Sequence, residues 1–242
     1  MTRVLCIAGF GDDSSMFDGL ARANLPSQID FIAIDLPGFG APPLTGEPTT
    51  LAAVAKFVDD ACRKHRTQII LAHSVASIIA SVAARREGSP IELILSLEGN
   101  LTPEDAYFSG KAAQYDTPTE FRDAFLPKLA KKGEDDPIID RYRRVVERAD
   151  PTALWQLGRD AHRFSQEHEP GVHLMQSTRT VYLYNPDNLP AVSLQWLENN
   201  PIARLELTGV SHWPSVDNPD LLATTIHSAL IQEGYADGSV EG

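Results

Sequence analysis

Short runs of apolar residues, many of them β-branched, alternate along the chain with longer stretches whose apolar positions have helical spacing. The apolar runs lie at 4–9, 30–35, 68–73, 91–98, 180–184 and 203–209. The helical stretches lie at 14–24, 49–65, 74–87, 189–199 and 218–233. Because the apolar runs are continuous rather than alternating with polar residues, they indicate strands buried on both faces. The order predicts an α/β fold in which helices cover both faces of a mostly parallel sheet of roughly six strands.

One long interval interrupts this alternation. Residues 101–179 separate the fourth and fifth predicted strands and contain no strand-like run. Within them, 118–132 and 135–168 have helical spacing, and Pro151 interrupts the second stretch at a position suited to the first turn of a new helix. We therefore expect a helical cap at 101–179, inserted into one core domain formed by residues 1–100 and 180–242.

A serine lies at the junction between a predicted strand and a predicted helix. In the segment QIILAHSVASIIASVAA, Ser74 follows the apolar strand and precedes an alanine-rich helix. A nucleophile on such a tight turn needs small residues two positions before and after it, usually glycines, and here both are alanines, Ala72 and Ala76. The simpler alternative is that Ser74 only caps the helix.

A serine nucleophile needs a base, and the loop after the last predicted strand supplies a histidine. The segment ARLELTGVSHWPSVDNPD places His212 after Leu207 and before the last helix. The other histidines have no such placement, and their spacings match no metal motif, so we expect neither a metal site nor a cofactor. His73, next to the serine, is expected to support the turn by packing or hydrogen bonding.

Four segments, taken in order, make the chain similar to the α/β-hydrolase superfamily: AGFGDDSSMFDGL at 8–20, IDLPGFGAPP at 34–43, LAHSVA at 71–76 and LTGVSHWPSVDNP at 207–219. The resemblance implies that Ser74 is the nucleophile and His212 the general base. It also implies an oxyanion hole formed by the backbone N–H groups of Phe10 and Val75. The chain departs from the family in beginning at the strand that members usually reach third, and in having Ala8 and Gly9 where His-Gly is usual.

The acid of the implied triad is left open among three carboxylates. In the superfamily it commonly follows the penultimate strand, at a position that corresponds to Asn188 here, with Asp187 one residue before it. In a second arrangement, found in some haloalkane dehalogenases, the acid ends the strand that follows the nucleophile's helix, and that residue is Glu98. We favour Glu98 over Asp187, with Asp105 as a further candidate.

Composition narrows the class of partner. The chain has 21 Lys and Arg against 33 Asp and Glu, and its net charge of -12 disfavours nucleic acids and anionic membranes as partners. Cys6 and Cys62 form no CxxC or zinc pattern, and no apolar stretch is long enough to span a bilayer. These features predict a cytoplasmic protein whose partner is a small-molecule substrate.

The expected function is that of a cofactor-free serine hydrolase, which cleaves a small, partly apolar ester, lactone or related carbonyl compound through an acyl-enzyme. Haloalkane dehalogenases and epoxide hydrolases carry Asp at the position of Ser74, which argues against both. Two alternatives stay open, because the fold does not select the reaction. One is a C–C hydrolase or hydroxynitrile lyase that uses the same Ser and His. The other is a non-catalytic ligand receptor, which the alanines beside Ser74 favour.

Overall fold

The computed structural model describes residues 1–23 and 29–236, and in them a parallel sheet forms the centre of the molecule. The strand order is β2-β1-β5-β6-β7-β8, and every neighbouring pair is parallel. The strands are β1 (Thr2–Ile7), β2 (Ile29–Ile34), β5 (Ile69–His73), β6 (Leu93–Leu97), β7 (Arg179–Tyr184) and β8 (Ala203–Glu206). A short separate pair, β3 (Leu36–Pro37) and β4 (Gly40–Ala41), follows β2. The predicted α/β fold with about six parallel strands is confirmed.

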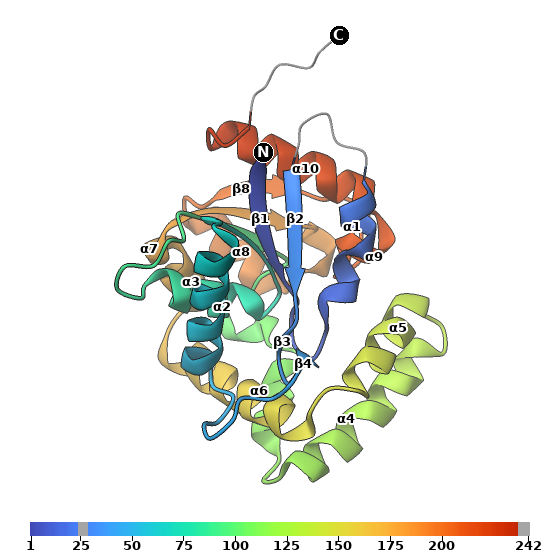
Figure 1. The fold of residues 1–242 in the computed structure, drawn as a ribbon. Helices are drawn as coiled ribbons and strands as arrows, with labels where there is room; N and C mark the ends of the chain where they lie inside the picture. Colours follow the sequence, from blue (N-terminus) through green and yellow to red (C-terminus); the bar gives the residue numbers. More distant parts are fainter. Residues whose placement is uncertain (24–28, 237–242) are drawn as a thin grey trace.

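Helices lie on both sides of this sheet (Figure 1). One side carries α1 (Asp18–Arg22), α9 (Pro214–Asp217) and α10 (Pro219–Gln232). The other side carries α2 (Leu51–His65), α3 (Ala76–Ala84), α7 (Pro170–Ser177) and α8 (Ala191–Asn199). The helix expected at 14–24 is a 3-10 turn, η1 (Ser14–Phe17), followed by α1, and Asn24 lies outside the described residues. Because both faces are covered, the central strands β5 and β6 are fully buried, as their continuous apolar runs predict.

The segment between β6 and β7 is helical. It contains the 3-10 turns η2 (Pro103–Asp105) and η3 (Ser109–Gln114), then α4 (Pro118–Gly133), α5 (Pro137–Val146) and α6 (Pro151–Glu167). Proline opens each of these three α-helices, after a capping Thr117, Asp136 or Asp150, which explains why the stretch expected at 135–168 divides into α5 and α6. In Figure 1, α4 and α5 run side by side and protrude beyond the sheet.

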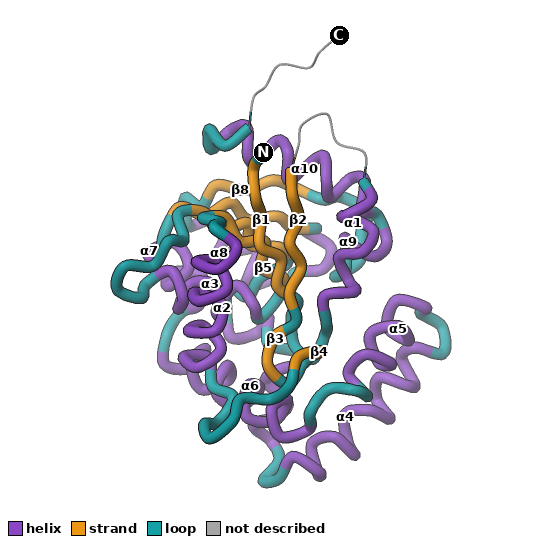
Figure 2. The backbone as a smooth tube through the Cα atoms, in the orientation of Figure 1, coloured by secondary structure: helices purple, strands orange, loops and turns teal. Residues whose placement is uncertain are grey.

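The two ends of this helical segment meet at the sheet. The N–H of Gly171, at the start of α7, donates to the carbonyl of Leu101 at 2.8 Å. From there α7 packs against α3 and β7, in the place of an ordinary crossover helix. All six strands are parallel, and in Figure 1 the arrow of β2 points toward the side where α4, α5 and α6 lie. Figure 2 shows these three helices as a separate group beyond the strands. The carboxyl ends of the strands therefore face α4, α5 and α6, and this end of a parallel sheet is where ligands bind.

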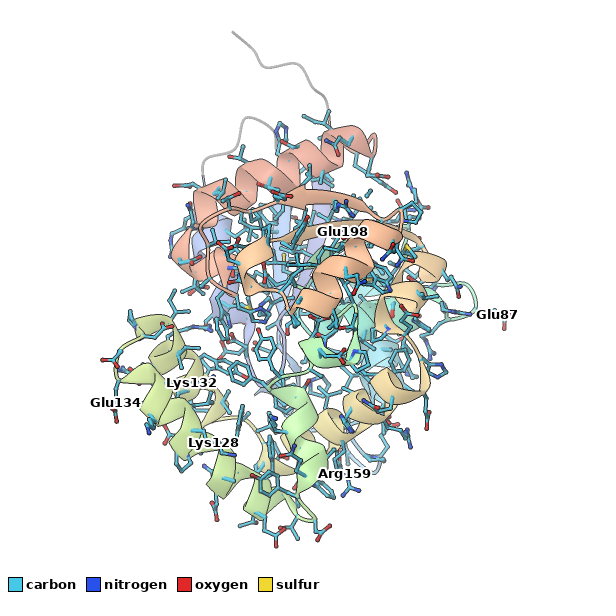
Figure 3. All side chains as sticks on the ribbon, turned by 180° about the vertical axis from the view of Figure 1, so that it is seen from behind. Glu87, Lys128, Lys132, Glu134, Arg159 and Glu198 are labelled. Atoms are coloured by element: carbon cyan, nitrogen blue, oxygen red, sulfur yellow. The ribbon has the colours of Figure 1, made fainter. Side chains whose placement is uncertain are left out.

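Side chains fill the space between the sheet and these helices, as the view from behind shows (Figure 3). Lys128 lies on α4 and Glu134 directly follows it, while Nζ of Lys132 lies over the ring of Phe108. Within the part of the chain that the structure describes, no helix is long and apolar enough to cross a membrane.

Candidate active site

Ser74 lies on a strained turn between β5 and α3. Its φ angle of 54° is in the left-handed region, where a residue with a side chain is rare. The N–H of Ser74 donates to the carbonyl of Leu97 at 2.9 Å, which ties the turn to the end of β6. Ala72 and Ala76, at the two positions that need small side chains, are both completely buried. Strain of this kind persists where the surroundings enforce it, and it is typical of functional sites.

The loop after β1 approaches Ser74 so closely that only glycine fits. A Cβ atom on Gly9 would lie 2.9 Å from Nδ1 of His73 and 3.0 Å from Cβ of Ser74. This contact brings the next residue, Phe10, to the same pocket as Ser74. Neither the N–H of Phe10 nor that of Val75 donates to any acceptor that the described residues contain. Two backbone donors beside Ser74 thus have no internal partner.

The structure brings Glu98 and His212 together. Glu98 directly follows β6 with a φ angle of 50°, and its side chain is 0% exposed. Its Oε2 atom lies 3.3 Å from Nδ1 of His212, while its Oε1 atom accepts the N–H of Asn185 at 2.6 Å. This arrangement leaves Nε2 of His212 on the other side of the ring, as a base for Ser74 requires.

The other two candidate carboxylates are held elsewhere. The N–H of Asp187 donates to Oδ1 of Asn185, and no contact in the described structure joins its carboxylate to His212. Asp105 lines the pocket, but its carboxylate accepts the N–H groups of Leu101 and Thr102 at 2.8 Å each. Of the three carboxylates, only Glu98 is in contact with the imidazole.

Two asparagines occupy the loop where the superfamily commonly places its acid. The side chains of Asn185 and Asn188 both donate to the carbonyl of Val210, at 2.6 and 3.3 Å, and so hold the loop that carries His212. The backbone N–H of Asn185 also donates to Glu98, and the side chain of Asn188 lowers the pKa of that carboxyl. The sequence pattern marks Asn188 only as the usual position of the acid and does not mark Asn185, because the role of both asparagines depends on contacts with two other loops.

Burial sets the ionisation of this pair. It raises the pKa of Glu98 from 4.5 to about 8, against the opposing effect of the hydrogen bonds from Asn185 and Asn188. Burial also lowers the pKa of His212 to about 3, so its imidazole is neutral at pH 7. When Glu98 is protonated it donates to Nδ1, and the ring proton then sits on Nε2, where it blocks proton uptake from Ser74. The ionised carboxylate selects the opposite tautomer, which can act as a base.

His73 supports the same loops. Its Nε2 atom lies 2.7 Å from the carbonyl of His212, and burial keeps its pKa well below the ordinary value. The ring is therefore neutral and donates from Nε2 to that carbonyl. The hydrogen bond links the strand before Ser74 to the loop of His212, in agreement with the supporting role expected from the sequence.

Ser74 and His212 line a narrow pocket against the helical segment between β6 and β7. Its walls are largely aromatic, and they include Phe108, Tyr142 and Trp213, whose ring centroids lie 5.0 to 6.4 Å apart. Only about 20 Å³ can hold the centre of a water molecule, which is room for about one water. Among residues 1–23 and 29–236, no cluster of three or more His, Cys, Asp or Glu is arranged to hold a metal ion.

The model of the alpha/beta hydrolase family matches residues 4–225, which is most of the chain. The chain belongs to the alpha/beta hydrolase family. Among curated proteins, none matches this hydrolase by sequence.

Solved structures with the same fold include enzymes of several activities. A thermophilic esterase from Thermogutta terrifontis is 17% identical, with a TM-score of 0.71 over 96% of this hydrolase and 90% of the esterase. An AqdC variant, described as recognising and cleaving the ring of the Pseudomonas quinolone signal, is 15% identical, with a TM-score of 0.74 over 96% and 91% of the two chains. A mutant of the N-acyl homoserine lactonase AidH is 10% identical, with a TM-score of 0.72 over 98% and 91%. At these identities the likeness establishes the fold alone.

Proposed function

We propose that this alpha/beta hydrolase is a serine hydrolase that cleaves a small ester, lactone or related carbonyl compound. The observation that carries the proposal is the 3.3 Å contact between the buried Glu98 and Nδ1 of His212, in a pocket shared with Ser74 on its strained turn. A nucleophile, a base and an acid that orients the base are the three groups that acyl transfer by a serine requires.

The reaction follows from these positions. Nε2 of His212 takes the proton from Ser74 as Oγ attacks the carbonyl carbon, and the ionised Glu98 stabilises the resulting imidazolium. The N–H groups of Phe10 and Val75, which have no other partner, donate to the oxyanion. His212 then returns the proton to the leaving group, which departs and leaves an acyl-enzyme. Water, activated by the same histidine, attacks the acyl group and restores Ser74.

The pocket favours a small substrate with an apolar or aromatic group. Its aromatic walls suit a short acyl chain or a single ring. Because the pocket in this structure has room for only about one water, we expect the cap to move before a substrate enters. Two proteins of the same fold act on esters and on lactones, as the names esterase and lactonase state. Both cysteines are free and buried, which fits a reducing compartment, and we place the protein in the cytoplasm.

The experiment that tests this proposal is labelling with a fluorophosphonate probe, combined with hydrolysis of p-nitrophenyl esters of increasing chain length. Labelling and hydrolysis are expected in the unchanged protein and absent in Ser74→Ala. Ser228→Ala, on an exposed face of α10, is the matched control and retains both. The shortest esters are expected to react fastest, because the pocket is small.

A second candidate function uses the same fold and the same site. The AqdC variant, which is described as cleaving a ring, shares this fold. A C–C hydrolase or lyase would use the same Ser74 and His212. Probe labelling without hydrolysis of any ester would favour this alternative, whereas the absence of labelling as well would favour a ligand receptor on the hydrolase fold.

A further inference from the structure

The loop that carries the proposed oxyanion donor Phe10 has little backbone structure of its own. Between β1 and η1, its only internal backbone hydrogen bond in the described structure runs from the N–H of Asp12 to the carbonyl of Gly9, and it is long at 3.3 Å. Gly11, with a φ angle of 70°, adds conformational freedom. An oxyanion donor is effective only when it is held in place before the reaction, so other groups must fix this loop.

Two consecutive residues of the cap helix α5 supply that support. The hydroxyl of Tyr142 donates to the carbonyl of Phe10 at 2.6 Å. Nη1 of Arg141 lies 2.6 Å from both carboxylate oxygens of Asp12. These residues are more than a hundred positions away from the loop in the sequence, so the contacts depend on the packing of α5 against the core.

Burial makes the contact of Asp12 with Arg141 obligatory. Asp12 is 1% exposed and Tyr142 is 2% exposed, while Arg141 is 24% exposed. A carboxylate buried this deeply is costly unless a charged partner and hydrogen bonds compensate it. If the cap opened, Asp12 would lose its charged partner and would have to move toward water, taking Phe10 with it.

The same carboxylate also reaches the loop of the proposed base. Nε1 of Trp213, the residue directly after His212, donates to Oδ2 of Asp12 at 3.2 Å. Asp12 thus connects three parts of the molecule: the oxyanion loop, the base loop and the cap.

We propose that Arg141 and Tyr142 are positioning residues that make the oxyanion hole complete only when the cap is closed. This inference rests on the proposed serine hydrolase function and extends it to the cap. The cap then does more than cover the substrate, because closing it aligns a donor for the transition state. Arg141 does not itself line the pocket, so its effect is transmitted through Asp12 and Phe10.

The test is a comparison of kcat and KM for Arg141→Met and Tyr142→Phe with two matched controls. The first control, Arg144→Met, removes an arginine from the same helix whose partner is Asp140 on the surface. The second, Tyr115→Phe, removes a cap hydroxyl whose one hydrogen-bond partner in the described structure is Lys128, which Figure 3 shows on α4. We expect kcat to fall about tenfold or more in the first two variants, and by no more than the ~10²- to 10³-fold that the loss of a whole oxyanion donor costs. For Arg141→Met we expect KM to change less than about twofold. Both controls should retain the parent's kcat.

A transition-state analogue separates positioning from general damage. An alkyl boronic acid, which forms a tetrahedral adduct with the serine, should lose affinity for Arg141→Met by the same factor as kcat/KM falls. Arg141→Lys, which keeps a positive charge near Asp12, should recover part of the loss. Because Arg141→Met leaves a buried charge unpaired, the double variant Asp12→Asn with Arg141→Met serves as a second test. It removes both charges and should fold, yet it should still have a reduced kcat.

The outcomes distinguish this inference from the function on which it rests. If the unchanged protein is labelled at Ser74 and hydrolyses esters, while folded Arg141→Met and the double variant keep kcat within about twofold, the inference is wrong and the proposed function stands. A rise in KM with unchanged kcat would also overturn it, since that would mean that Arg141 contributes to substrate binding. If the unchanged protein is neither labelled nor active, the proposed function fails and the inference fails with it.

Discussion

The buried Glu98 makes a quantitative prediction about pH. If the neutral His212 acts as a base only when Glu98 is ionised, kcat/KM follows the ionisation of Glu98, whose pKa burial raises to about 8. The ionised fraction is then about 1% at pH 6 and about 90% at pH 9, a rise of about 90-fold. A profile set by a histidine of ordinary pKa, ~6.5, would rise only about fourfold over the same range.

The assay is the initial rate of p-nitrophenyl ester hydrolysis, followed at a wavelength where nitrophenol and nitrophenolate absorb equally. Ser74→Ala supplies the background rate at each pH, because alkaline hydrolysis of the ester also increases with pH. The slope of log kcat/KM against pH should be close to one below pH 7 and should level off above pH 8.

Glu98→Gln is the control, because glutamine keeps the shape of the side chain but cannot ionise. Its activity should be lower by orders of magnitude, since the imidazole loses the group that selects its tautomer, and its remaining rate should lose the rise between pH 6 and 9. A parent profile with a midpoint near 6.5 that is flat from pH 7 to 9 would refute the reasoning. So would an unchanged midpoint in Glu98→Gln.

Three further predictions concern the same site. Asp187→Asn should change kcat less than about threefold, because no contact joins this side chain to the imidazole. A larger loss in steady-state kinetics would mean that Asp187 takes part in the reaction. Gly9→Ala should destabilise the protein by about 1–3 kcal/mol in urea denaturation and reduce probe labelling, because its Cβ would press on His73 and Ser74. Full labelling of this variant would contradict the close approach of Gly9 to Ser74. Glu98 keeps its proton up to about pH 8 in the folded protein, whereas the unfolded chain releases it near pH 4.5. Between these values the free energy of unfolding, relative to that of Glu98→Gln, should therefore fall by up to about 1.4 kcal/mol per pH unit. If denaturation curves at pH 5 and pH 8 give the same difference in this free energy between the two proteins, the pKa of Glu98 is not raised.

The sequence predicts those features that short-range patterns determine. Apolar runs locate the six strands of the central sheet. The inner strands β5 and β6 are apolar and buried at nearly every position because helices cover both their faces, whereas the edge strand β8 is mostly exposed. The runs do not give the strand ends. The first run suggests 4–9, whereas β1 spans Thr2–Ile7, since pairing with β2 starts at Thr2 and the chain leaves the sheet after Ile7 to form the oxyanion loop. The position of Ser74 between a strand and a helix is predicted from its immediate neighbours alone.

The sequence cannot decide features that depend on contacts between distant loops. The choice between Glu98 and Asp187 depends on where β6 and β7 end relative to each other, and a hydrogen bond from the N–H of Glu98 to the carbonyl of Leu183 fixes that register. The contact between Asp12 and Arg141 joins residues 129 positions apart, and each looks like an ordinary surface charge when read locally. Buried ion pairs between separate segments leave no periodic signal in a single sequence.

The hydrogen bond between Leu101 and Gly171 holds together the two ends of the segment that forms the cap. Because its entry and exit points touch, the chain leaves the sheet at β6 and returns to the head of α7 at almost the same place, whatever lies between. We expect insertions or deletions between these two points to leave the pairing of β6 with β7 unchanged, because that pairing lies outside the segment. A replacement of the whole segment would still have to offer a cation to Asp12 and a donor to the carbonyl of Phe10, as Arg141 and Tyr142 do. It would also have to replace the hydrogen bonds that Gln156 and Asp160 accept from the backbone of Thr49 and Leu51.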